Sequence, residues 1–189
     1  IELFELGNFY PAGDEHILVY EVTGKVVPEG GIPHDVGVIV NNVETLLNIE
    51  RAVDEGAPVT QRYITVTGEI KHSMVTKIPI GTPIGQVIDY AGGATVEDFL
   101  VVVGGPMMGM VTDDLSVPAT KTTTALIVLP KNHNVVRSKI MDPRRLLEIT
   151  KTVCCQCSRC TDLCPRHLLG HDIEPHKIMR SLAWASDLS

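Results

Sequence analysis

The chain has 189 residues, of which 44% are hydrophobic and 4% aromatic, and its formal net charge is -7. This length and apolar content are enough to bury a core in one large domain or two small ones. The negative charge argues against a nucleic-acid groove, because phosphate binding needs clustered Lys and Arg, and the longest basic cluster here is Arg144 with Arg145.

No apolar run approaches the roughly 18 to 20 residues that span a bilayer, and no charged-then-apolar leader opens the chain. The sequence therefore predicts a soluble protein of the cytoplasm, without a transmembrane segment. The chain starts at Ile1 rather than Met. This start predicts that the sequence is a fragment of a longer protein.

The N-terminal part contains two β-rich runs, residues 17–23 and 36–40, with a connection rich in Pro and Gly between them. These runs predict strands, and a helix is expected from about Val43 to Val53. Asn41 and Asn42 therefore stand where a strand would pass into a helix. A helix N-terminus binds phosphate readily, but either amide suits a simple helix cap equally well.

The middle of the chain alternates strands with one short helix. The expected strands and helix, in chain order, are strand 62–70, strand 74–81, helix 82–93, strand 99–105 and strand 124–130. A hairpin followed by a helix and further strands predicts a small β-grasp domain. The loop 104–109, GGPMMG, permits close approach of the backbone, and its Met side chains would either contact an apolar ligand or fill the core. Residues 131–143 are expected to connect this domain to a helix at 143–153.

All five cysteines follow that helix, within CCQCSRCTDLCP. Disulfides inside so short a segment would close almost no chain, so a metal site is the better interpretation. Cys154, Cys157, Cys160 and Cys164 have the CxxCxxCxxxCP spacing of bacterial ferredoxins, which holds [4Fe-4S] clusters, and Cys155 lies outside it. The spacing therefore predicts an iron-sulfur centre.

Two alternatives to this ligand set stay open. Four thiolates also suit tetrahedral zinc, although structural zinc usually takes two CxxC pairs separated by a longer loop. The nearby His167, His171 and His176 could contribute to a mixed ligand set, or they could be surface and packing residues.

The role of Cys164 depends on the number of clusters. In two-cluster ferredoxin modules the first three cysteines of a run hold one cluster, and the fourth holds the other. No cysteine occurs after Cys164. Either Cys164 completes a single cluster, or a second cysteine run follows Ser189; we favour the second interpretation.

Residues 10–49 resemble the second half of the flavin domain shared by the NADH-oxidising subunit of respiratory complex I and its relatives. The segments PAGDEH and NVET carry this resemblance. It implies FMN as a cofactor, contacted by Gly13, Asp14, Glu15, Asn41 and Asn42. The glycine-rich flavin loop of that family would precede Ile1. Residues 58–130 similarly resemble the soluble-ligand-binding β-grasp module of the same relatives.

These observations predict an α+β fold class with three parts. Residues 1–57 are expected to form the C-terminal half of a complex I flavin-subunit-like α/β domain that binds FMN. Residues 58–130 are expected to form the β-grasp, soluble-ligand-binding domain. Residues 131–189 are expected to contain a linker helix and a small helical ferredoxin-like iron-sulfur segment.

Residues 160–180, CTDLCPRHLLGHDIEPHKIMR, resemble the cobalamin reductases of propanediol-utilisation microcompartments. This resemblance implies an oxidoreductase that passes electrons from NADH through FMN and two [4Fe-4S] clusters to a corrinoid. It also implies cobalamin or a corrinoid adenosyltransferase as partner, with contacts to a microcompartment shell or other enzymes, and a location inside the bacterial microcompartment. We assign no catalytic acid or base. The alternatives are the C subunit of an Rnf ferredoxin:NAD oxidoreductase and a non-enzymatic, metal-stabilised binding module.

Overall fold

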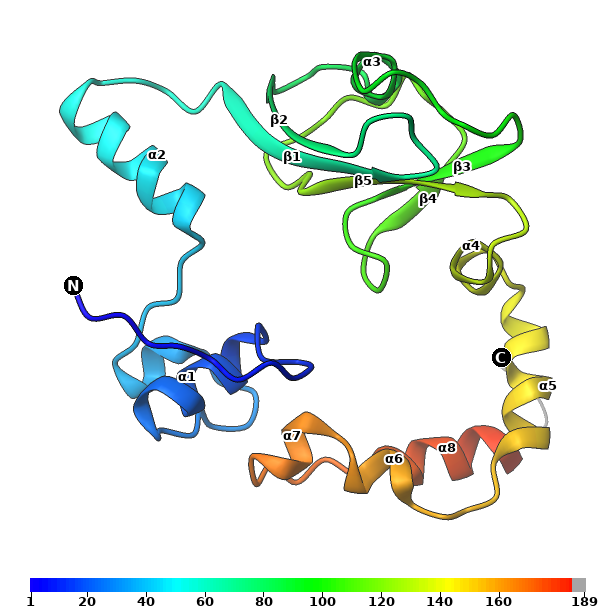
Figure 1. Cartoon of the computed structure of the whole chain (residues 1–189). Coiled ribbons are helices and arrows are strands. Elements are labelled where there is room, and N and C mark those ends of the chain that lie inside the picture. Colours follow the sequence, from blue (N-terminus) through cyan, green and yellow to red (C-terminus); the bar gives the residue numbers. More distant parts are fainter. Residues whose placement is uncertain (185–189) are drawn as a thin grey trace. The chain divides into compact units, whose positions relative to one another are not determined.

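A computed structural model describes residues 1–184 (Figure 1). The chain forms two compact units. The first combines residues 1–42 with the segment from Asp142 onward, and the second contains residues 43–141. Compactness does not decide which segments share an evolutionary relationship, so the predicted division at residues 57 and 130 stays a prediction.

The second unit is built on a mixed five-stranded sheet with the strand order β2-β1-β5-β3-β4 (Figure 1). The strands are β1 (Gln61–Gly68), β2 (Met74–Pro79), β3 (Phe99–Val103), β4 (Met110–Thr112) and β5 (Ala125–Pro130). Strands β1 and β5 pair in parallel, and the other neighbours are antiparallel. The helices of this unit are α2 (Val43–Asp54), α3 (Ile84–Tyr90) and α4 (Asn134–Lys139).

Helix α3 packs on the sheet and closes the core. Ile64 and Val66 alternate along β1 and are at most 1% exposed, as the period of two in a strand requires. They join Leu126 of β5 and Ile84 of α3 in one apolar cluster. The predicted β-grasp architecture is therefore confirmed. The segment expected to be only a connector contains helix α4, and β4 was not predicted.

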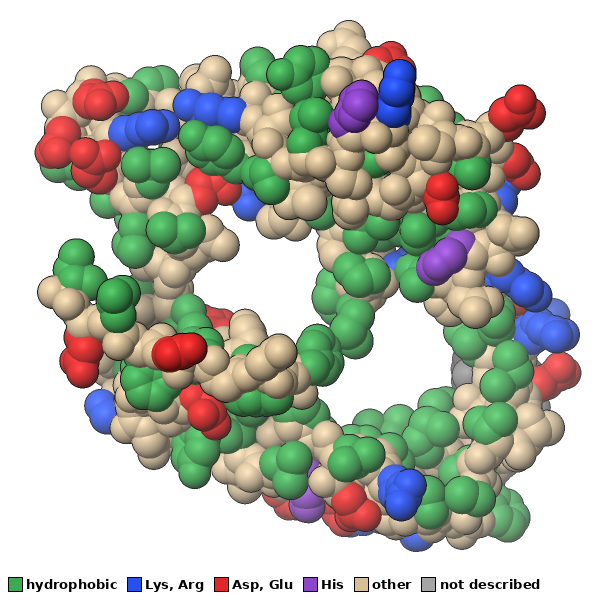
Figure 2. Space-filling model, viewed as in Figure 1, with side chains coloured by type: hydrophobic (Ala, Val, Ile, Leu, Met, Phe, Trp, Pro, Cys, Tyr) green, Lys and Arg blue, Asp and Glu red, His purple; other side chains and the backbone are tan. Residues whose placement is uncertain are grey.

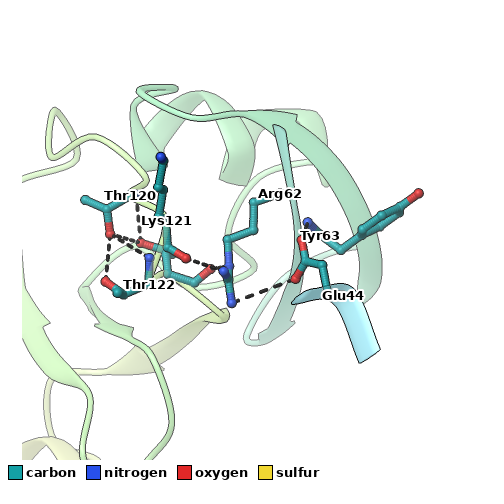
Figure 3. Close-up of polar contacts among 7 residues, drawn as sticks. Glu44, Arg62, Tyr63, Thr120, Lys121 and Thr122 are labelled. Atoms are coloured by element: carbon teal, nitrogen blue, oxygen red, sulfur yellow. Dashed lines mark hydrogen bonds and ion pairs between the residues drawn. The ribbon is translucent and has the colours of Figure 1, made fainter. Parts of the chain in front are cut away.

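Arg62 links the start of β1 to two other parts of this unit (Figure 3). Its Nε donates to the carbonyl of Thr123 at 2.7 Å, and its Nη1 donates to the carbonyl of Lys121. Its Nη2 also lies 3.8 Å from the Glu44 carboxylate, which accepts a hydrogen bond from the Tyr63 backbone at 3.0 Å. These contacts hold the first turn of α2 beside β1, and the helix occupies the range that the sequence predicted.

The first unit contains helices and no strand among its described residues. The helices are α1 (Glu15–Thr23), the 3-10 helix η1 (Pro33–Val36), α5 (Pro143–Val153), α6 (Arg159–Asp162), α7 (Pro165–Leu168) and α8 (Pro175–Trp184). The helix predicted at 143–153 is confirmed. The long helices α5 and α8 pack against each other.

The surface of the first unit carries many apolar side chains, drawn in green in Figure 2. Those of α5 include Leu146, Ile149 and Val153, and Ile178 of α8 is also exposed. Leu147 is the one buried residue of α5, and no described residue of α8 is buried. These two helices therefore contribute much less to a buried core than the sheet of the second unit does.

The strands predicted at residues 17–23 and 36–40 are wrong. Residues 17–23 belong to α1, because the Asp14 carboxylate accepts hydrogen bonds from the first amides of this helix and Gly24 ends it in a left-handed conformation. Gly37, at φ 74°, ends η1 inside the second run and interrupts an extended chain. Local capping therefore outweighs the β preference of the Val and Ile residues.

Candidate functional site

Helix α5 leads directly into the cysteine loop. Asp142 caps its N-terminus by accepting a hydrogen bond from the Arg144 amide at 2.7 Å. At the other end the Cys154 amide donates to the Thr150 carbonyl, so Cys154 is the residue at which the helix stops. Leu147 is buried and fixes α5 within the unit. The helix therefore determines where the first thiol of the run lies.

Two residues between the cysteines adopt a left-handed backbone conformation. Gln156 has φ 58° and Ser158 has φ 61°, which is uncommon for residues other than glycine. The Arg159 amide, followed by the Cys155 thiol, donates to the Cys157 sulfur and lowers the pKa of that thiol. The Arg159 amide thus favours the thiolate form of Cys157.

Three of the four predicted ligands, Cys154, Cys157 and Cys160, line one pocket of about 200 Å³. Cys155 lines the same pocket, whereas Cys164 is not among its lining residues. Within residues 1–184, no group of three or more His, Cys, Asp or Glu side chains converges closely enough to hold a single metal ion. Three thiols that line one space suit a cluster of several metal atoms.

His176 also lines this pocket. Its backbone N–H donates to the Thr161 hydroxyl oxygen at 3.0 Å, and that hydroxyl lies 2.8 Å from His176 Nδ1. Because the hydroxyl accepts the first hydrogen bond, it can donate the second to Nδ1. This reciprocal pair joins α8 to α6, which carries Cys160. A mixed ligand set is not needed to explain the position of His176.

The predicted flavin-binding residues lie at two places in the first unit. Gly13, Asp14 and Glu15 form the turn that starts α1, where Asp14 is the N-cap. Asn41 and Asn42 are exposed and precede α2. Of these five residues, Glu15 alone lines a pocket described in this unit. The pocket has a volume of about 240 Å³, and residues 32–34 and 38–40 form the rest of its lining.

The Asp14 carboxylate has a partner that the sequence did not indicate. Arg166, the second residue after Cys164, places Nη1 3.0 Å from Oδ1 and donates from Nη2 to Oδ2 at 3.1 Å. These two side chains are 152 positions apart in the sequence, so no local pattern could identify the pair. The contact connects the predicted flavin turn to the segment that follows the cysteines.

The chain matches three protein families. Residues 1–51 match the Nuo51 FMN-binding domain, residues 63–111 match the SLBB domain, and residues 153–189 match the 4Fe-4S dicluster domain. The first and third of these families indicate FMN and [4Fe-4S] clusters as cofactors.

Curated relatives agree with this assignment. The chain is 47% identical to cobalamin reductase PduS of Citrobacter freundii, and also to that of Salmonella typhimurium, over 96% of its length. It is 37% identical over 89% of its length to the C subunit of the Na+-translocating ferredoxin:NAD+ oxidoreductase complex of Acetobacterium woodii. The resemblance predicted from the sequence is confirmed. The chain covers about 40% of the length of the cobalamin reductases and 35% of the length of the Acetobacterium protein.

Solved structures show the same fold. An NAD+-reducing [NiFe]-hydrogenase in the H2-reduced state matches 92% of this chain and 32% of its own chain, with a TM-score of 0.55 and 19% identity. The air-oxidised state of such a hydrogenase gives a TM-score of 0.54 at 18% identity, with 91% and 31% of the two chains covered. Among the described helices, none combines the length and apolar character needed to cross a membrane.

Proposed function

We propose that this chain is part of an oxidoreductase that takes electrons from NADH and passes them, through FMN and [4Fe-4S] clusters, to a corrinoid. The observation that carries this proposal is 47% identity, over nearly the whole chain, to proteins named cobalamin reductase. A bound flavin can accept a hydride as an electron pair, and an iron-sulfur cluster transfers single electrons.

The residues of this chain would have distinct roles. Cys154, Cys157 and Cys160 would hold the first cluster, because these three thiols line one pocket. Cys164 would serve a second cluster. The Arg159 amide would stabilise the Cys157 thiolate. We propose no acid or base in this chain, since hydride and electron transfer need none from it.

The proposed flavin contacts are the residues implied by the family resemblance. Gly13 and Asp14 lie at the N-terminus of α1, where the Asp14 carboxylate accepts from the His16 and Ile17 amides. Glu15 lines the pocket near Val40, and Asn41 and Asn42 follow directly in the sequence.

The C subunit of an Rnf-type complex is the second candidate, because identity to such a protein reaches 37% over 169 residues. The two candidates share the cofactors and differ in the electron acceptor. The cobalamin reductase proposal includes cobalamin or a corrinoid adenosyltransferase as partner, and a location in the bacterial cytoplasm within a microcompartment. The Rnf candidate instead predicts exchange with ferredoxin.

The test uses the protein extended to the length of its relatives, reconstituted without oxygen. We expect bound FMN and a brown protein whose broad absorption near roughly 400 nm, typical of iron-sulfur thiolate sites, bleaches with NADH. Cob(II)alamin should then be reduced, as followed by trapping with an alkylating agent. Reduction of ferredoxin but not of the corrinoid would favour the Rnf candidate. A colourless zinc protein without flavin would refute both.

A further inference from the structure

We infer that Arg166 and His171 are positioning residues that hold the segment after the cysteines against helix α1 and so keep the iron-sulfur part in place beside the flavin part. This inference rests on the proposed function for its catalytic consequence. The contacts themselves lie within the first unit and do not depend on any cofactor.

The Asp14-Arg166 pair is the first contact of this kind. Arg166 Nη2 donates to Asp14 Oδ2 at 3.1 Å, and Nη1 lies 3.0 Å from Oδ1 as an ion pair without a hydrogen bond. The side chains are 29% and 32% exposed, so water screens the pair only in part. Asp14 also accepts from the His16 and Ile17 amides. One carboxylate therefore caps α1 and binds the residue two positions after Cys164.

His171 supplies the second contact. This residue is 7% exposed, and its Nε2 lies 2.8 Å from the carbonyl oxygen of Val27. Since a carbonyl can only accept, Nε2 carries the proton. The His171 ring also meets the His16 ring edge-on, with the centroids 5.8 Å apart. Val27 is fully buried. The segment is thus anchored at two points, Arg166 within α7 and His171 after it.

Together these residues define the α1 anchor: Asp14, His16, Val27, Arg166 and His171. Each of its two hydrogen-bonded contacts spans more than 140 sequence positions, as the separations of 152 and 144 show. The backbone from Cys164 to His171 contains α7 and the turn at Gly170, which the His171 amide closes by donating to the Arg166 carbonyl at 3.1 Å. Cys164 therefore has a defined position relative to α1.

The test compares Arg166→Met and His171→Phe with Arg180→Met in the extended, cofactor-loaded protein. Met and Phe keep most of the side-chain volume and remove the polar contacts. Arg180 is an exposed residue of α8 and serves as the matched control. Hydrogen-deuterium exchange is measured at the amides of α1 and of residues 165–173. Iron and FMN are counted per chain, and the cluster is reduced with NADH and, separately, with dithionite.

We expect Arg166→Met and His171→Phe to retain iron and FMN and to be bleached normally by dithionite. Exchange in α1 should become about tenfold faster in Arg166→Met, the factor expected when a hydrogen bond to a charged group is lost, and it should also become faster in His171→Phe. NADH-driven bleaching should slow, because dithionite reaches the cluster directly whereas NADH must act through the flavin. Arg166→Lys, which keeps the charge, should recover part of the exchange protection.

Unchanged exchange in α1 for both variants would overturn the inference. Loss of iron in both variants, with iron retained in Arg180→Met, would also overturn it, because the residues would then act in cluster loading. If the wild-type protein binds no flavin, the proposed function fails, and exchange in α1 still decides whether the anchor exists.

Discussion

Cys155 and Cys157 are neighbours in the pocket but differ in backbone setting. Both line the space that Cys154 and Cys160 share. Cys157 lies between the left-handed residues Gln156 and Ser158, and its sulfur accepts from a backbone amide. Cys157 therefore both belongs to the ferredoxin spacing and accepts a hydrogen bond from the backbone. Cys155 lies outside the spacing, and its thiol donates to the Cys157 sulfur.

This difference predicts opposite results for two serine variants. Cys157→Ser should lose the intact [4Fe-4S] cluster, because a hydroxyl is a poor substitute for a thiolate ligand. Cys155→Ser should retain it. Iron and sulfide per chain after anaerobic reconstitution provide the measurement, with the absorption near roughly 400 nm that thiolate-bound clusters show as a second check. Equal loss in both variants would show that the ligand register is wrong.

His16 gives the anchor region a predictable response to pH. Burial, followed by the charge of Arg166, lowers the pKa of His16 below the ordinary value of 6.5. As the pH falls below 6.5, His16 is protonated in the unfolded chain before it is protonated in the folded chain. The contribution of His16 to stability is therefore complete above that pH and is lost on acidification.

We expect His16→Phe, which cannot bind a proton and keeps a ring beside His171, to reduce the loss of unfolding free energy between about pH 7 and pH 5. Urea titrations of wild type and variant at several pH values across this range measure the effect. The same dependence of stability on pH in both proteins would contradict the assignment to His16.

At the scale of elements, secondary structure was predicted correctly where the apolar residues that repeat in the sequence are also the buried ones in the structure. The alternating apolar residues of β1 and the hairpin to β2 were visible in the sequence, as was helix α5, which starts after the N-cap Asp142. Prediction failed for α1, where the Val and Ile content suggested a strand but the caps Asp14 and Gly24 determine a helix. In a prediction from sequence alone, two capping residues have less influence than the strand preference of several Val and Ile residues.

The candidate site divides in the same way. The cysteine spacing is a local pattern and could be predicted. The left-handed conformations of Gln156 and Ser158 could not be predicted, because neither Gln nor Ser favours this conformation as Gly does. Arg166 and His171 could not be paired with Asp14 and Val27 either, since only the folded chain brings such distant segments together.

The sheet offers a test at the level of one strand pair. Gly68 ends β1 at φ 94°, and a Cβ added there would lie 2.1 Å from the Val128 carbonyl oxygen of β5. Gly81 has the same φ, with nothing within 4 Å of an added Cβ. Both alanine variants thus carry the left-handed strain, and only Gly68→Ala also carries the clash.

We expect Gly81→Ala to lower the free energy of unfolding by about 1–2 kcal/mol. Gly68→Ala should lower it by more than about 3 kcal/mol, because the parallel β1-β5 pair must separate to admit the methyl group. Denaturant unfolding of the two variants, beside wild type, measures the difference. Equal losses of unfolding free energy in the two variants would mean that β5 can move away from the methyl group at little cost in free energy.

For the molecule as a whole, the chain corresponds to about 40% of the length of the cobalamin reductases that it resembles. It matches a dicluster family over residues 153–189, yet it contains one run of cysteines. Cys164, the N-cap residue of α7, is not among the residues that line the pocket of the other three predicted ligands. This arrangement is expected if Cys164 belongs to a second cluster, whose other ligands would come from a longer chain.

In the 189-residue chain, the first cluster would then have three dedicated thiolates, and one iron would depend on water, a stray thiol or Cys164. An iron without a thiolate is the easiest to lose, so oxygen should degrade this cluster quickly. The chain extended to the length of its relatives should hold two clusters and resist oxygen longer. Iron per chain and the half-life of the cluster absorption in air, measured for both forms under the same conditions, test this prediction. If the 189-residue chain alone holds a complete [4Fe-4S] cluster as durably as the extended form, Cys164 completes a single cluster and the two-cluster assignment is wrong.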